Sequence, residues 1–157
     1  MTSPPDELIH ASCVAFSGRG VILTGASGSG KSSTALQLIA LGAELVGDDQ
    51  LLLQGDGDEL RVAAPAPLRG LIEARFIGIL RLPHIVSAKP VLVVDLDATC
   101  DQRLPQRRNT VINSLRLPLI AGKNVPNLVY AVAAWIGSTG DADMLDPEKH
   151  TLNDARQ

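Results

Sequence analysis

The sequence Gly25-Ala26-Ser27-Gly28-Ser29-Gly30-Lys31-Ser32 decides the fold, because its spacing is G-x-x-x-x-G-K-S, the Walker A pattern. An apolar run at residues 21–23 comes before it and predicts a strand, and residues 33–41 come after it and predict a helix. Glycines let the backbone curl so that several N–H groups point at one anion, and the helix N-terminus adds a partial positive charge. The stretch therefore predicts a phosphate-binding loop (P-loop).

Nucleotide phosphates are the predicted ligand of this loop, because the strand–loop–helix context disfavours a glycine-rich turn that binds nothing. In such loops the lysine, here Lys31, reaches the β- and γ-phosphates, and the hydroxyl that follows it, here Ser32, ligates Mg²⁺. We therefore expect a nucleotide to contact the residues of the loop and the start of its helix: Gly25, Ala26, Ser27, Gly28, Ser29, Gly30, Lys31, Ser32 and Ser33.

Composition limits the class of protein. The chain has 157 residues, of which 45% are hydrophobic, enough for one domain with a substantial core. The formal net charge of −3 gives no basic field for nucleic acid. No apolar run approaches the roughly 20 residues of a membrane span, and the N-terminus lacks the pattern of a signal peptide. We therefore expect a cytoplasmic protein that binds neither nucleic acid nor membrane.

Three ranges describe the expected organisation. Residues 1–7 are predicted to be a flexible tail, residues 8–136 an α/β domain, and residues 137–157 a polar, disordered tail. Within the domain we expect a central mixed β-sheet, the helix after the P-loop and a C-terminal helix at residues 127–136. Residues 8–16 read as one strand that forms a hairpin with the P-loop strand.

Two pairs of carboxylates compete for the role of acid near the phosphates. Asp48 and Asp49 end a short strand that follows the P-loop helix, and they would lie beside the phosphates if that strand neighbours the P-loop strand. One could bind Mg²⁺ and the other could take a proton from an attacking hydroxyl. Asp95 and Asp97 follow a near-continuous apolar strand and resemble a generic Walker B site. Periodicity alone does not choose between the pairs.

Two further segments carry charges in unusual places. Residues 68–80 are mostly apolar but include Arg69, Glu73 and Arg75, which predicts either partners for a metal–phosphate site or a helix with one exposed face. Residues 101–113 are polar, and their arginines either face solvent or contact phosphate.

Taken together, residues 8–136 resemble the catalytic domain of the HPr kinase/phosphorylase family. Four stretches carry the resemblance: I-H-A-x-x-V around His10, the loop G-A-S-G-S-G-K-S-S, the segment L-G-A-E-L-V-G-D-D that ends at Asp49, and R-G-L-I-E-A-R-F-I-G-I-L from Arg69. The last is similar to the family signature L-L-E-I-R-G-L-G-I-I. The spacing from Lys31 to the aspartates, together with this signature, is more specific than a P-loop alone.

The resemblance implies an ATP- and Mg²⁺-dependent serine kinase, with a phosphorylase activity in the reverse direction, that acts on HPr or a related phosphocarrier and assembles as a hexamer. By position, Asp48 matches the proton acceptor and donor, Lys31 the P-loop lysine, His10 the active-site histidine and Arg103 the active-site arginine. Ser32 and Glu73 match the Mg²⁺ ligands, and Asp49 is the third candidate ligand. The resemblance also favours Asp48 over Asp95 as the carboxylate near the phosphates, since the strand that ends at Asp95 is scaffold in the family.

The chain departs from the family pattern in ways that bear on function. It resembles the short proteobacterial forms, which lack the N-terminal domain of longer members, and its C-terminus is short for the family. The family loop R-P-G-R-N, associated with dephosphorylation, reads I-A-G-K-N at residues 120–124, so we expect weaker phosphorylase activity. Two alternatives stay open: a small-molecule P-loop kinase with a lid at residues 103–108, and a nucleotide-binding regulatory module without turnover.

Overall fold

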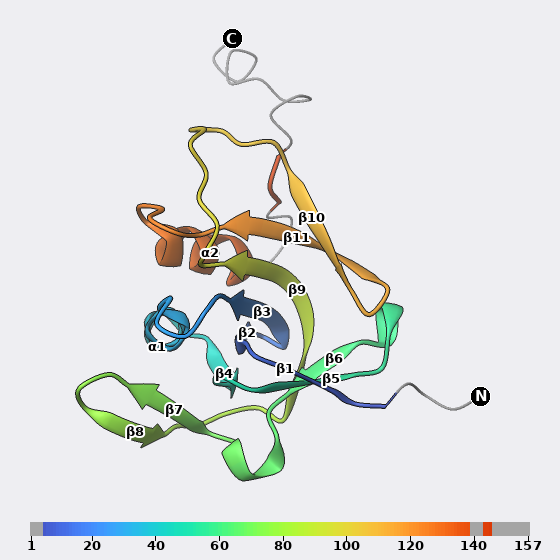
Figure 1. Cartoon of the computed structure of the whole chain (residues 1–157), viewed down its shortest axis with the longest axis vertical. Coiled ribbons are helices and arrows are strands. Elements are labelled where there is room, and N and C mark those ends of the chain that lie inside the picture. The colour runs from blue at the N-terminus through green and yellow to red at the C-terminus, as the bar shows by residue number, and fades with distance from the viewer. Residues whose placement is uncertain (1–4, 139–142, 146–157) are drawn as a thin grey trace.

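A large mixed β-sheet with two helices forms the frame of the molecule in the computed structural model, which describes residues 5–138 and 143–145 (Figure 1). In chain order the elements of this part are β1 (Glu7–Ile9), β2 (Ser12–Phe16), β3 (Arg19–Thr24), α1 (Lys31–Ala40), β4 (Glu44–Gly47), β5 (Leu51–Gln54), the short 3₁₀ helix η1 (Gly57–Glu59), β6 (Arg61–Ala63), the 3₁₀ helix η2 (Ala66–Leu68), β7 (Leu71–Ala74), β8 (Gly78–Arg81), β9 (Ser87–Asp95), β10 (Arg108–Ile112), β11 (Leu115–Ala121) and α2 (Leu128–Ile136).

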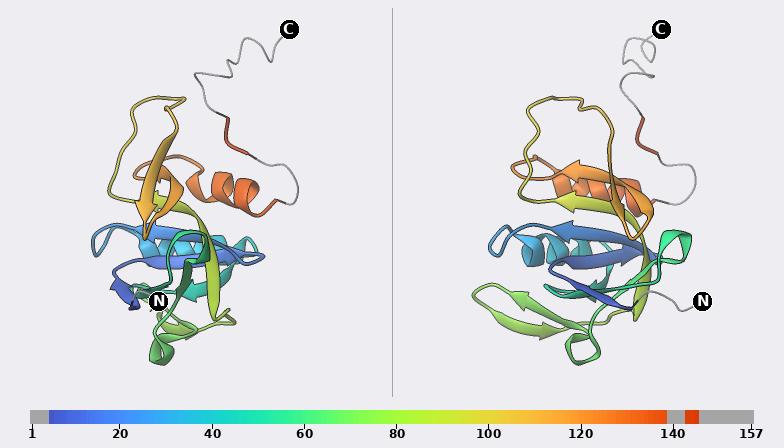
Figure 2. Two further views of the ribbon diagram at one scale, coloured as in Figure 1. Left: turned by 90° about the vertical axis from the view of Figure 1, so that its right-hand side faces the viewer. Right: turned by 45° about the vertical axis from the view of Figure 1, so that its right-hand side comes forward.

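The long strand β9 joins two parts of the sheet. Its first residues pair antiparallel with β6, and the rest of the strand pairs parallel with β3 on one side and, near its end, with β11 on the other. The strand order is β1-β5-β6-β9-β3-β2-β4, with β11 beside β9 and β10 outside β11. The β10–β11 hairpin and the separate β7–β8 hairpin therefore lie at opposite ends of the molecule (Figure 2).

Four strands of this sheet end at one edge. β3, β9 and β11 run parallel, and β4 runs in the same direction because β2, which is antiparallel to both neighbours, lies between it and β3. The arrowheads of β3, β9 and β11 point the same way in Figure 1. In α/β sheets, ligands bind in the crevice outside the carboxyl ends of the strands. The P-loop, Asp48 and two further loops all follow strands at this edge.

The two faces of the sheet bury different hydrophobic clusters, because successive residues of a strand point to opposite sides. In β3, Val21 and Leu23 pack on the face that α1 and α2 cover, whereas Ile22 packs on the face that β5 and β6 cover. The predicted P-loop helix, C-terminal helix and mixed sheet are thus confirmed. Among the described residues, neither helix has the length and apolar composition to cross a membrane.

Two predictions for the first half of the chain were wrong in detail. The single strand predicted at residues 8–16 is divided by a bend at His10, because β1 pairs with β5 whereas β2 forms the expected hairpin with β3. The helix considered for residues 68–80 is absent from the described structure. That segment forms a 3₁₀ turn and the β7–β8 hairpin, whose tip carries Phe76 at φ 66°.

The second half of the chain also differs from expectation. The polar segment at residues 101–113 contains a strand, β10, which pairs with β11. Ile120 and Ala121, predicted to lie in a loop, are the last residues of β11. Residues 1–4, 139–142 and 146–157, which include most of the two predicted tails, lie outside the described part, while Glu7 already belongs to β1.

Candidate active site

The P-loop connects β3 to α1, and its glycines take backbone conformations that other residues rarely adopt. Gly25, Gly28 and Gly30 all have positive φ. At Gly25 a side chain is also excluded by space, because a Cβ atom there would lie 2.5 Å from Oγ of Ser29. That Ser29 oxygen is buried and has no hydrogen-bond partner among the described residues. A buried unpaired hydroxyl is costly, which fits a loop that changes its contacts when an anion binds.

Lys31 is only 5% exposed, and its ammonium group lies inside the loop. Its Nζ donates to the carbonyl oxygens of Gly25 and Ala26, at 2.8 and 3.1 Å. The lysine therefore holds the loop closed with its own charge. An ammonium carries three donor hydrogens, so one remains for a phosphate oxygen while these two contacts persist.

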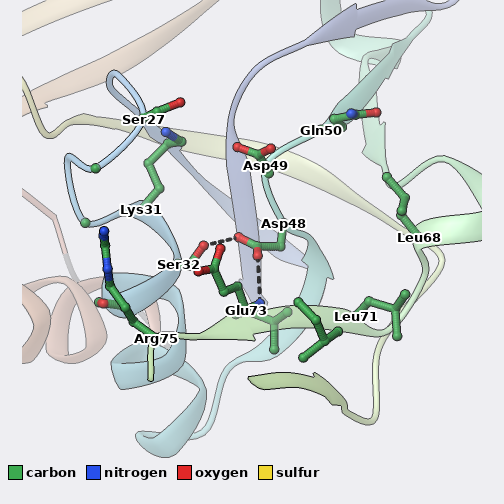
Figure 3. Close-up of a pocket in the computed structure, with 15 residues that line it drawn as sticks. Ser27, Lys31, Ser32, Asp48, Asp49, Gln50, Leu68, Leu71, Glu73 and Arg75 are labelled. Carbon is green, nitrogen blue, oxygen red and sulfur yellow. Dashed lines mark hydrogen bonds between the residues drawn. The ribbon is translucent and has the colours of Figure 1, made fainter. Parts of the chain in front are cut away.

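A cavity of about 490 Å³ lies beside the P-loop (Figure 3). The loop contributes Ser27, Gly28, Gly30, Lys31, Ser32 and Ser33 to its wall; Gly25, Ala26 and Ser29, also predicted to bind nucleotide, do not line it. The opposite wall consists of Asp48, Asp49 and Gln50 after β4, and of Leu68 together with residues of the β7–β8 hairpin. Two of the predicted stretches, the double aspartate and the family-like signature, thus face the P-loop across one cavity.

Three donors from three segments fix the carboxylate of Asp48. Oδ1 accepts hydrogen bonds from the hydroxyls of Ser32 and Ser12, both at 2.8 Å, and Oδ2 accepts one from the backbone N–H of Glu73 at 3.1 Å. Figure 3 shows the contacts to Ser32 and Glu73 as dashed lines. A carboxylate has about four lone-pair positions, so one stays available on Oδ2. Asp48 therefore lines the cavity with a fixed orientation and a free acceptor site.

Ser12 is a site residue that the sequence reading missed. The strand with Asp48 is not the neighbour of the P-loop strand, as the prediction required, because β2 lies between them. Ser12 begins β2 at the same edge of the sheet and is fully buried. Besides donating to Asp48, its hydroxyl accepts from the N–H of Asp49 at 3.1 Å. The available signal was a hydroxyl in an otherwise apolar strand, two residues after His10.

Asp49 and His10 form a pair next to the cavity. Asp49 has φ 68°, and its Oδ1 lies 3.2 Å from Nδ1 of His10. Both side chains are about half exposed, at 59% and 48%. Asp49 lines the cavity but His10 does not. His10 therefore reaches the cavity through Asp49, which makes it a candidate positioning residue in this structure.

The oxygen donors around the cavity suit Mg²⁺. Ser32, Asp48, Asp49 and Glu73 all line it, and Mg²⁺ prefers oxygen ligands, few of them from protein and the rest from water and phosphate. The described residues contain no group of three His, Cys, Asp or Glu side chains arranged to hold a metal alone. The oxygen donors therefore fit an Mg²⁺ ion that arrives with a nucleotide.

Other candidates lie elsewhere. Arg103 is exposed in the connection between β9 and β10 and lines neither of the two cavities beside the P-loop. Asp95 also lines neither, and its Oδ1 accepts from the N–H of Asp97 at 2.9 Å within the turn after β9. Asp48 therefore lines the same cavity as Lys31, whereas Asp95 does not. The role assigned to Arg103 stays a prediction.

The altered loop at residues 120–124 is not part of this cavity. Ile120 belongs to β11 and is partly buried against the hydrophobic cluster beneath α1 and α2. Lys123 and Asn124 line a second cavity on the other side of the P-loop. The comparison of Ile120 with the first arginine of R-P-G-R-N stays a prediction, as does the weaker phosphorylase activity that follows from it.

The chain is similar to known proteins over most of its length. Residues 3–141 match the model of the HPr Serine kinase C-terminal domain. HPr kinase/phosphorylase of Lactobacillus acidophilus is 37% identical over 145 residues, which cover 80% of this chain and 44% of that protein. The enzyme of the same name from Levilactobacillus brevis is 34% identical over 145 residues, covering 81% and 47%.

A solved structure extends the likeness to the fold. The Hpr(Ser) kinase/phosphatase from Coxiella burnetii matches with a TM-score of 0.70 and 24% identity, over 82% of this chain and 92% of that one. The chain spans about half the length of the curated relatives it matches. Because the family model covers most of the chain, the protein belongs to the family of the HPr serine kinase C-terminal domain.

Proposed function

We propose that this chain is an ATP- and Mg²⁺-dependent protein kinase that phosphorylates a serine of HPr or of a related phosphocarrier. The observation that carries the proposal is Asp48, held by Ser32 of the P-loop on one oxygen and carrying a free lone pair on the other. A general base must lie within hydrogen-bond reach of the hydroxyl that it deprotonates. Asp48 meets this condition for a serine that enters the cavity toward the end of a bound nucleotide.

The chemistry needs one proton transfer and one phosphoryl transfer. Asp48 takes the proton of the acceptor serine as its oxygen bonds to the γ-phosphorus, and the bond from that phosphorus to the bridging oxygen of ADP breaks. In the reverse direction Asp48 returns the proton to the serine oxygen. Phosphoryl transfer demands little covalent chemistry of a protein, so fixed orientation is the main contribution of these residues.

The other cavity residues stabilise the negative charge of the phosphates or hold the Mg²⁺ ion that does so. Lys31 places its ammonium on the phosphates, and the loop N–H groups with the N-terminus of α1 add partial positive charge. Mg²⁺, when bound, neutralises charge that develops on the phosphate oxygens. Ser32, Glu73 and Asp49 are the residues that would hold it, directly or through water. His10 would orient Asp49 through the contact between them.

The surface beside the cavity favours a protein acceptor over a small molecule. The β7–β8 hairpin carries Arg75 and Ile79, which line the cavity, and next to them Phe76 and Ile77, whose side chains are largely or fully exposed. Contiguous exposed apolar side chains of this kind mark contact sites for proteins. The predicted arginine lid of a small-molecule kinase, residues 103–108, does not reach this cavity.

One assay separates the candidate functions. Purified chain with Mg²⁺ and γ-labelled ATP is incubated with an HPr-type phosphocarrier or with a panel of small hydroxyl acceptors, and mass spectrometry locates the phosphate. Label on a carrier serine supports the proposal. Label on a small acceptor alone would establish the small-molecule kinase, and nucleotide binding without any transfer would establish the regulatory module. The Asp48→Asn variant serves as the control for contaminating kinases.

Two further parts of the proposal follow the family. The relatives are named kinase/phosphorylase, so we include a reverse activity, tested by pyrophosphate release from the phosphorylated carrier with Mg²⁺ and inorganic phosphate. We also propose a homo-hexamer in the cytoplasm, tested by light scattering and by cell fractionation. A monomer in light scattering at assay concentration would contradict the assembly but leave the chemistry of Asp48 untouched.

A further inference from the structure

A second cavity of about 430 Å³ lies on the opposite side of the P-loop from Asp48. The two cavities share Ser27 and Gly28 in their walls. The crest of the P-loop is therefore the boundary between them, and one extended molecule that crosses this crest would enter both. The proposed chemistry uses only the first cavity, whereas Gly122, Lys123 and Asn124 of the loop after β11 line the second.

The second cavity is built by the sheet itself. β3, β9 and β11 run parallel and in register at their ends, where Thr24 pairs with Asp95 and Ala121 pairs with Asp95 from the other side. The P-loop and the two loops that follow β9 and β11 thus leave the sheet side by side. This is the edge at which parallel sheets bind ligands.

Hydrogen bonds tie these three loops into one rim. The N–H of Ala26 donates to Oδ2 of Asp97 at 2.7 Å, and the N–H of Lys123 donates to the carbonyl of Ala98 at 2.9 Å. Gly122, in the loop after β11, leaves no room for a side chain, because a Cβ atom there would lie 2.7 Å from Cγ1 of Val94. A rim with this many cross-links is formed before a ligand arrives, as small-molecule sites usually are.

The chemistry of the cavity wall differs from that of the first cavity. Its apolar surface comes from Leu96, which is buried, and from Leu128, which is partly buried. Asp97, Lys123 and Asn124 supply polar groups around this surface. One carboxylate and one ammonium nearly cancel, so the cavity has no net charge to attract a polyphosphate. The wall is more polar than apolar, which suits a sugar with its hydroxyl groups and the polar edge of a neutral ring that lies against the leucines.

We infer that the second cavity binds the nucleoside end of the nucleotide, base and ribose, while the phosphates cross the P-loop into the cavity with Lys31 and Asp48. This inference rests on the proposed function, since it assumes that the P-loop holds a nucleotide. It assigns Leu96 and Leu128 to contact with the base, and Asp97, Lys123 and Asn124 to the polar edges of base and sugar. It also gives the loop after β11 a role in nucleotide affinity instead of phosphate attack.

The test compares a nucleotide with its phosphates alone. Calorimetric titration of the full chain with MgATP and with magnesium tripolyphosphate should show that MgATP binds more tightly, by about tenfold or more, if the nucleoside makes contacts of its own. Lys123→Glu, an exposed substitution, and Leu128→Ala should each raise the Kd of MgATP and leave that of tripolyphosphate unchanged. Circular dichroism checks that each variant is folded.

Other outcomes would overturn the inference, and they differ from failure of the proposed function. Equal affinity of the unaltered chain for both ligands would show that the nucleoside makes no contact. Equal weakening of both ligands by Lys123→Glu would mean that the cavity holds phosphate, as a phosphorolysis site would. If the unaltered chain binds neither ligand, the proposed function is wrong and the inference falls with it. Lys31→Ala, which should weaken both ligands, is the matched control.

Discussion

Neighbouring segments fix the orientation of Asp48, the residue that we propose as the general base. Its donors come from the P-loop helix, from β2 and from β7, so its orientation depends on three elements that meet only in the folded chain. Lys31, Ser32 and Asp48 could be predicted, because each lies in a short motif whose chemistry is local. Ser12 could not, because its contact with Asp48 depends on β2 lying between β3 and β4.

The first prediction separates the two competing carboxylates. Asp48→Asn should lower the rate of transfer by about 10²–10⁴-fold, the usual contribution of a general base, while MgATP still binds. Asp95→Asn should change the rate little, because the amide oxygen can still accept the N–H of Asp97. Steady-state kinetics on both variants measure the ranking. A larger loss for Asp95→Asn would mean that Asp95, as in a generic Walker B site, is the carboxylate that takes part in the reaction.

The second prediction concerns Ser12 as a positioning residue. Ser12→Ala removes a donor to Asp48 and an acceptor for the N–H of Asp49, which should cost about 1–3 kcal/mol of folding free energy because buried groups lose partners. It should lower kcat and leave the KM for ATP unchanged, because the phosphate contacts persist. Urea denaturation and kinetics measure the two effects.

Ser12→Thr distinguishes positioning from packing. The threonine keeps the hydroxyl but adds a methyl group in a fully buried position, which costs stability. We expect kcat to recover even where stability does not. A variant that is stable but slow would show that the hydroxyl of Ser12 is not what orients Asp48.

At the scale of elements, the segments that the sequence described poorly are those whose partners are distant. Residues 8–16 are mostly apolar, and pairing with two different strands divides them between β1 and β2. The charges of the β7–β8 hairpin, such as Glu73 and Arg75, do not by themselves distinguish a helix from a strand. The turn of the hairpin depends on Phe76, whose φ is 66°. A positive φ is uncommon for a bulky residue, and such positions cluster at functional sites.

The third prediction tests this hairpin as the contact surface for the acceptor. Phe76→Asn should raise the KM for the phosphocarrier by about tenfold, the effect of one well-buried interface residue, and leave the KM for ATP unchanged. The melting temperature should not fall, because asparagine tolerates positive φ better than phenylalanine. Val111→Asn is the matched control, since Val111 is exposed on β10 at the other end of the molecule. Equal effects of the two variants would exclude a specific surface on the hairpin.

At the scale of the whole molecule, one sheet edge collects the ends of β3, β4, β9 and β11 and thereby both cavities. The P-loop predicted that a phosphate site would lie at such an edge. The P-loop did not predict the strand order, because the pairing of β9 with β3 joins residues that are far apart in the sequence. The same holds for the place of β10 at the edge of the sheet. The second cavity could therefore not be predicted from the sequence, because three loops that are far apart in the chain contribute to its wall.

The fourth prediction follows from the burial of the sheet. Burial raises the pKa of the Cys13 thiol well above its ordinary value, whereas Cys100 is partly exposed. A thiol reagent at mildly alkaline pH should modify Cys100 in the folded protein and both cysteines after denaturation, as counted by mass spectrometry. Above the ordinary thiol pKa the unfolded chain releases a proton that folded Cys13 retains, so stability should fall as pH rises. Rapid native labelling of Cys13 would contradict its position in β2.

The last prediction connects the P-loop to the stability of the whole fold. The ammonium of Lys31 bonds to two loop carbonyls, which water can satisfy after Lys31→Ala because the loop lies at the surface. The variant should therefore fold, but it should lose phosphate binding and transfer. A ligand at about 100 times its Kd stabilises the folded state by about 2.7 kcal/mol, so MgATP should raise the melting temperature of the unaltered chain by several degrees.

Differential scanning calorimetry with and without MgATP measures this difference. Lys31→Ala should show no rise, whereas Lys89→Ala should show the full rise, since Lys89 is exposed on β9 and pairs with Arg19 at the end of β3 remote from the P-loop. The two variants remove the same charge, so any general effect of net charge on MgATP binding cancels between them. A full rise in Lys31→Ala would mean that the nucleotide binds elsewhere, and the assignment of the P-loop would be wrong.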